Sequence, residues 1–124
     1  MEDERLKNKN FIDAFKKAVS GIIYSIKTQK NVRIQIVIAV IVIILGFIFK
    51  LNAVEWLFVC FAIMFVIATE VMNTAVETVV NMYTNKYNEL AKIAKDVAAG
   101  AVLLAALNSV IVAGIIILSR IKGV

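Results

Sequence analysis

Three long runs of apolar residues constrain the fold of this chain more than any other feature. They cover about residues 32–49, 54–82 and 97–118 of a 124-residue sequence that contains no proline. About 20 apolar helical residues span the ~30 Å hydrocarbon core of a bilayer. The chain is 61% hydrophobic, above the roughly 45–50% of soluble proteins. We therefore predict an all-α integral membrane protein with three transmembrane helices, forming one domain over residues 1–124.

A different pattern precedes the first run. Between about Asn10 and Gln29, apolar residues recur at helical spacing and lysines occupy other positions. This pattern predicts an N-terminal amphipathic helix that lies on the membrane surface, within an arm of residues 1–29. A soluble helix packed on a partner is the alternative. The apolar positions are Phe11, Ala14, Phe15, Ala18, Val19, Ile22, Ile23 and Ile26.

Basic residues are distributed unevenly around the three runs. Eight lysines and arginines precede the first run, from Arg5 to Arg33, whereas the first loop has only Lys50. The second loop has Lys86, Lys92 and Lys95. The positive-inside rule then places the arm and the second loop in the cytoplasm of a cell whose inner or plasma membrane holds the chain. The net charge of +5 is explained by this topology and by anionic lipid, so we expect no nucleic-acid partner.

A stripe of polar residues interrupts the second run at its cytoplasmic end. Glu70, Asn73, Thr74, Glu77 and Asn81 occur within the stretch EVMNTAVETVVN. At 100° per residue, the seventh residue of a helix returns to within about 20° of the first, so both glutamates lie on one face. An ionisable residue within a span is costly and indicates a functional site. For Glu77 a solvated interfacial residue is the alternative, and the neutral residues also suit plain interhelical hydrogen bonds.

The spacing of the two glutamates indicates that they have separate roles. Glu70 and Glu77 are about 10.5 Å apart along the helix axis, too far to chelate one ion together. One can act as a general base while the other holds a metal. This division suits phosphoryl transfer, in which Mg²⁺ takes one or two protein carboxylates together with phosphate oxygens.

Two charged residues precede the third run, in the stretch KIAKDVAAGAV. Lys95 can neutralise phosphate charge, and Asp96 can accept a hydrogen bond from a nucleotide or from a lysine. The alternative is a helix cap at Asp96 with a snorkelling Lys95. The small residues that follow, from Ala98 to Ala101 and including Gly100, predict a close helix–helix contact.

The stretch EVMNTAVETVVN, followed after a short loop by AKIAKDVAAGAVL, resembles the signature of the prokaryotic diacylglycerol kinase family, which includes the small undecaprenol kinases. The resemblance extends over nearly the whole chain. It implies a lipid kinase that phosphorylates a membrane lipid alcohol with MgATP, and a homotrimer with composite sites at the cytoplasmic surface. The pattern FIDAFKKAVSGI and the EW pair that opens the second run are more similar to the polyprenol kinases, which favours undecaprenol over diacylglycerol.

The resemblance also implies roles for individual residues. Glu70 matches the catalytic base, and Glu77 matches a metal-binding glutamate. Asn73, Lys95 and Asp96 match positions near the nucleotide phosphates.

Three departures from the family pattern qualify these roles. Gln29 stands where the family commonly has a second metal-binding glutamate, so we expect it to be a weaker ligand for Mg²⁺. Asn81 stands where an aspartate is usual, and a histidine often present in the second loop is absent from NKYNEL. Gln29 favours the alternative function, a non-catalytic membrane protein of the same fold that has lost kinase activity. An active lipid kinase is favoured by the intact motif residues, which are Glu70, Asn73, Glu77, Lys95 and Asp96.

Overall fold

The computed structural model describes residues 4–123. Within this range the chain forms helices and no strand: α1 (Glu4–Thr28), α2 (Lys30–Ile48), α3 (Ala53–Tyr83) and α4 (Glu89–Lys122). By length and composition α2, α3 and α4 are each able to cross a membrane. The predicted all-helical fold with three candidate spans is confirmed. Residues 1–3 of the predicted arm, and Val124 at the end of the predicted domain, lie outside the described range.

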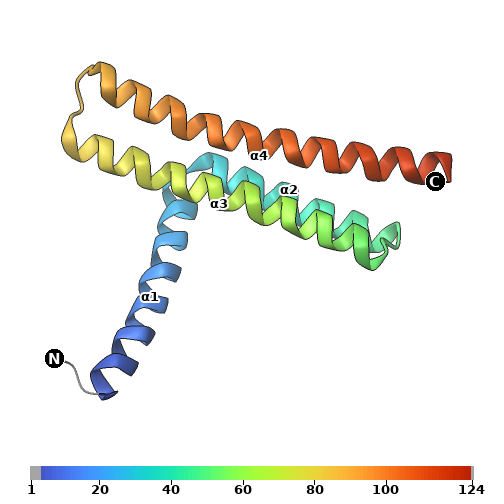
Figure 1. The fold of residues 1–124 in the computed structure, drawn as a ribbon, viewed down its shortest axis with the longest axis horizontal. Helices are drawn as coiled ribbons and strands as arrows, with labels where there is room; N and C mark the ends of the chain where they lie inside the picture. Colours follow the sequence, from blue (N-terminus) through green and yellow to red (C-terminus); the bar gives the residue numbers. More distant parts are fainter. Residues whose placement is uncertain (1–3, 124) are drawn as a thin grey trace.

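Helix α3 is the central element of the fold. Figure 1 shows α2, α3 and α4 running alongside one another, while α1 leaves the bundle at a steep angle. α3 packs closely against each of the other three helices, whereas in the described chain no Cα atoms of α2 and α4 come within 8 Å of each other. The buried residues of the bundle are mostly small or β-branched, such as Ala62 and Val66 of α3 and Ala105 of α4. Small side chains allow membrane helices to approach closely.

The break between α1 and α2 occurs at Gln29, without help from proline or glycine. Gln29 has an extended backbone, with φ −115° and ψ 113°. The guanidinium of Arg33 donates hydrogen bonds to the carbonyl oxygens of Ile26 and Lys27 at 2.8 and 3.0 Å. Carbonyls in the last turn of a helix have no partner within the helix, so these bonds stabilise the end of α1. The junction therefore holds Gln29 at the end of the bundle where α3 finishes.

Arg120 joins α4 to the connection between α2 and α3 at the opposite end. Its guanidinium lies 2.5 Å from a carboxylate oxygen of Glu55 and donates to the backbone carbonyls of Phe49 and Lys50 at 2.9 and 3.1 Å. Glu55 also forms a capping box with Asn52 at the start of α3. One side chain thus stabilises the end of α2 and the start of α3 together.

The closest packing at a glycine occurs at Gly46 of α2. A Cβ atom added there would lie 2.5 Å from Cη2 of Trp56 and 3.1 Å from a methyl group of Leu51. The predicted contact around Gly100 is different, because a Cβ added to Gly100 would meet no atom of the chain within 4 Å. Ala105, one turn further along α4, is fully buried. Within one chain, Gly46 is therefore the glycine that packing requires.

We expect Gly46→Ala to destabilise the protein by about 1–3 kcal/mol, since the added methyl group overlaps the indole ring of Trp56. Thermal unfolding of the purified protein in mild detergent measures the effect. Gly114→Ala is the matched control, because a Cβ at Gly114 meets nothing within 4 Å. Equal unfolding temperatures for the two variants would contradict this packing.

Candidate functional site

Glu70 is a buried carboxylate of α3 and follows the apolar stretch WLFVCFAIMFVIA. Only 4% of its surface is exposed, and Thr74, one turn further along, is 3% exposed. The Thr74 hydroxyl donates a hydrogen bond to the backbone carbonyl of Glu70 at 3.0 Å, and not to the Glu70 carboxylate. Among the described residues 10–123, no side chain forms a hydrogen bond or an ion pair with that carboxylate. A buried ionisable group without a partner costs free energy, which is typical of a functional residue.

Glu77 lies two turns beyond Glu70 and is held by two amides. The Asn73 side-chain nitrogen donates to Oε1 of Glu77 at 3.2 Å, and the Gln29 side-chain nitrogen donates to Oε2 at 3.4 Å. Asn73 precedes Glu77 by one turn of α3, whereas Gln29 comes from the α1–α2 junction, 48 residues earlier. We call Gln29, Asn73 and Glu77 the amide–carboxylate cluster. It fixes the orientation of the Glu77 carboxylate on the face of α3 that also carries Glu70.

The cluster contains an acceptor atom without a partner. Oδ1 of Asn73 is buried and accepts no hydrogen bond from the described part of the chain. An unsatisfied buried acceptor costs about 1–3 kcal/mol. Carboxylate and amide oxygens are the ligand types that Mg²⁺ prefers. The residues present therefore fit a magnesium ion that takes few protein ligands.

The same residues do not form a complete metal cage. Among the described residues, no three Asp, Glu, Cys or His side chains come together. Mg²⁺ usually keeps several waters and binds through one or two carboxylates plus substrate phosphates. Such a partial protein set is compatible with an ion that arrives together with a nucleotide.

Lys95 and Asp96 have partners outside the amide–carboxylate cluster and lie near the turn between α3 and α4. Lys95 donates to the side-chain oxygen of Asn81 at 3.1 Å, and Asp96 pairs with Lys92 at 2.6 Å. The alternative prediction of a helix cap at Asp96 is wrong. α4 begins at Glu89 and its cap is Asn88, whose side chain accepts from the backbone of the first turn. Asp96 is therefore on the second turn of a helix that starts earlier than the apolar run.

Asp96 has an ion-pair partner, Lys92, that was not predicted as a site residue. Lys92 engages Asp96 at the i, i+4 spacing, a separation at which opposite charges on a helix commonly pair. That spacing is visible in the sequence, so this partner was available as a prediction. The Gln29–Glu77 contact has no such local signal, because it joins residues that are far apart in the chain.

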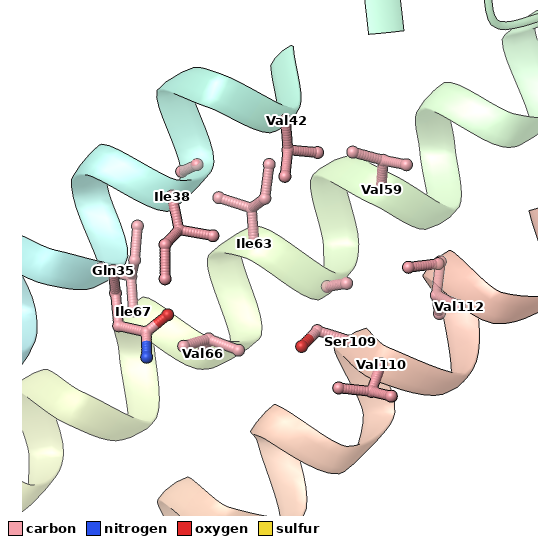
Figure 2. A pocket seen from close by; sticks show the side chains of 13 residues that line it. Gln35, Ile38, Val42, Val59, Ile63, Val66, Ile67, Ser109, Val110 and Val112 are labelled. Atoms are coloured by element: carbon pink, nitrogen blue, oxygen red, sulfur yellow. The ribbon is translucent and has the colours of Figure 1, made fainter. Parts of the chain in front are cut away.

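A separate apolar cavity of about 230 Å³ lies in the middle of the bundle, between α2, α3 and α4. Figure 2 shows Gln35 and Ser109 as the polar side chains among aliphatic ones such as Ile38, Ile63 and Val110. The Ser109 hydroxyl already donates to the carbonyl of Ala106 at 2.7 Å. No acidic or basic side chain lines this cavity, unlike the polar end of α3, which carries Glu70 and Glu77.

This chain is similar to known proteins over most of its length. The sequence profile of the prokaryotic diacylglycerol kinase family matches residues 16–117, which include every candidate site residue. A diacylglycerol kinase from Synechocystis sp. is 42% identical over 110 residues, 88% of this chain and 63% of that relative. This chain thus spans less than two thirds of the length of the Synechocystis protein.

A second relative matches the whole length of the chain. The undecaprenol kinase of Bacillus subtilis is 35% identical over 120 residues, which cover 97% of this chain and 98% of the relative. The family predicted from the stretch EVMNTAVETVVN is therefore confirmed. This chain belongs to the prokaryotic diacylglycerol kinase family, a family of membrane lipid kinases.

Proposed function

We propose that this chain transfers the γ-phosphate of ATP to the hydroxyl group of a membrane lipid alcohol, with undecaprenol as the first candidate and diacylglycerol as the second. The observation that carries the proposal is the placement of an unpartnered, buried Glu70 two helical turns from a Glu77 held by Gln29 and Asn73. A base and a metal ligand on one face of one helix are the groups that phosphoryl transfer requires.

Glu70 acts as the general base. Its carboxylate accepts the proton of the lipid hydroxyl as that oxygen forms a bond to the γ-phosphorus. The bond from the γ-phosphorus to its bridging oxygen breaks at the same time, and ADP leaves with the bonding electrons. Burial of Glu70 within α3 suits a lipid substrate, because the hydroxyl group approaches from the bilayer and not from water.

The other predicted residues bind and orient the nucleotide. Glu77, with the amides of Gln29 and Asn73, would hold Mg²⁺, which when bound would neutralise charge on the phosphate oxygens. Lys95 contributes a second positive charge, and Asp96 lies beside it on the turn of α4 that faces the α3–α4 connection. These groups stabilise the charge that develops on the transferring phosphoryl group.

We also propose the membrane arrangement that this chemistry needs. The arm and the α3–α4 connection lie in the cytoplasm, where ATP is found, and α1 rests on the membrane surface. The large apolar side chains of α1 support this arrangement, since Phe11 and Phe15 are 76% and 66% exposed in the isolated chain. The subunits form a homotrimer. The open space beside Gly100 leaves room for a helix of a second subunit there.

The two relatives are named for different lipid substrates, so they do not decide between the two lipid alcohols. The full-length relative is named an undecaprenol kinase, whereas the relative of higher identity is named a diacylglycerol kinase. Gln29 favoured a non-catalytic role, but both relatives are named as kinases, so we do not favour that role.

We expect a higher kcat/KM for undecaprenol than for diacylglycerol in the same mixed micelles. A clear preference for diacylglycerol would overturn the choice of substrate and leave the kinase assignment in place.

Glu70→Gln should reduce turnover by about 10²–10⁴-fold, because the amide cannot accept the hydroxyl proton and general bases contribute on this scale. Membrane insertion and oligomeric state should remain as in the unmodified protein. Glu89→Gln is the control, because this substitution makes the same change of charge at an exposed position in the first turn of α4. Turnover near the unmodified rate in a correctly assembled Glu70→Gln variant would remove Glu70 from the mechanism.

Gln29→Glu should lower the Mg²⁺ concentration for half-maximal activity by roughly three- to tenfold, because a charged oxygen ligand holds a hard cation better than a neutral amide. Without Mg²⁺ the same variant should unfold at a lower temperature, since two carboxylates then face each other across the Gln29–Glu77 contact. Glu77→Gln should raise the Mg²⁺ requirement. An unchanged Mg²⁺ curve for Gln29→Glu would show that residue 29 does not contribute to the metal site.

A further inference from the structure

A polar pocket of about 580 Å³ lies where α3 turns into α4. The last turns of α3 contribute Asn81, the connection contributes Asn85 and Lys86, and the first turns of α4 contribute Lys92, Lys95 and Asp96. Three lysines and one carboxylate thus share one hollow, next to the end of α3 that carries Glu77. The distribution of charge within this pocket decides which lysine is available to an anion.

Lys92 and Lys95 have different partners in this pocket. Lys92 lies 2.6 Å from the carboxylate of Asp96, so its charge is balanced within the helix. Lys95 instead donates to the neutral side-chain oxygen of Asn81 at 3.1 Å, across the turn between the two helices. Among the described residues 10–123, Lys95 forms no ion pair. Its charge is held in place but not neutralised.

We propose that Asn81 is a positioning residue, which holds Lys95 in the pocket with its charge free for the phosphates of the nucleotide. This inference rests on the proposed function, because it takes a nucleoside triphosphate as the ligand. A lysine side chain is flexible and strongly hydrated, so an amide acceptor that fixes its direction reduces the entropy lost when an anion binds. An aspartate at position 81, the residue usual in the family, would pair with Lys95 and compete with the phosphates for it, so the asparagine of this chain leaves more of the charge of Lys95 to the nucleotide.

The test compares two variants that add the same charge to the same pocket. Asn81→Asp should raise the Kd for ATP by roughly three- to tenfold, from competition for Lys95 together with repulsion of the phosphates. Asn85→Asp is the matched control, because Asn85 lines the pocket without contacting Lys95, and it should raise the Kd by about twofold or less. Binding of a fluorescent ATP analogue to the detergent-solubilised protein, with Mg²⁺ present, measures both.

Two further variants separate positioning from a general charge effect. Asn81→Ala removes the acceptor without adding charge, and should raise the Kd for ATP by a smaller factor than Asn81→Asp. In a Lys95→Ala background, Asn81→Asp should weaken binding no more than Asn85→Asp does, because the partner is gone. In kinase assays Asn81→Asp should raise the KM for ATP and leave both kcat and the KM for the lipid within about twofold of the unmodified protein.

The ATP-binding measurements test the role of Asn81, and phosphate transfer to a lipid alcohol tests the proposed function. Equal effects of Asn81→Asp and Asn85→Asp, or an effect of Asn81→Asp that persists in full without Lys95, would overturn the inference while phosphate transfer to lipid still supports the kinase. The predicted order of ATP affinities without any phosphate transfer to a lipid alcohol would uphold the positioning of Lys95 and overturn the proposed reaction. Asn81 is exposed near the end of α3, so these substitutions leave the bundle intact.

Discussion

Backbone groups in a hydrocarbon layer must be satisfied within their own segment, and this constraint sets the design of the whole chain. It explains why the membrane-spanning part of α3 is an uninterrupted helix. The helix covers Ala53–Tyr83 and is longer than a bilayer core requires. The last turns of this helix carry polar side chains beyond the apolar stretch, on the same rigid rod that crosses the membrane. Since α3 alone contacts all the other helices, the position of the site is fixed by the helix that organises the fold.

The two ends of the bundle are stabilised by different kinds of polar contact. At the end with the first loop, Arg120 joins three segments through its contacts to Glu55 and to two backbone carbonyls. At the other end, Gln29 and Asn73 hold Glu77 with neutral amides. At the end with the first loop, Arg120 and Glu55 form an ion pair. At the second end, none of Glu70, Glu77 and Lys95 forms an ion pair with another of the described residues 10–123.

The features that were predictable from the sequence are those with a short period or a simple composition. The apolar runs predicted the spanning helices, and a repeat of seven residues placed Glu70 and Glu77 on one face of a helix. The family resemblance implied that Gln29 and Glu77 share a metal site. Composition and spacing did not predict their contact, because the two residues are 48 positions apart in the chain. The start of α4 was also missed, because Asn88 caps it in a polar segment ahead of the apolar run. The glycine in closest contact proved to be Gly46, since its neighbour Trp56 belongs to another helix.

We propose that the polar end of α3 is a site for phosphoryl transfer to a lipid hydroxyl. The most direct measurement follows labelled γ-phosphate from ATP into the lipid fraction, with the purified chain, saturating Mg²⁺ and either undecaprenol or diacylglycerol in mixed micelles. We expect a labelled lipid monophosphate from at least one of the two alcohols, with ADP formed in equal amount. Correctly assembled protein that binds ATP yet labels neither alcohol would contradict it.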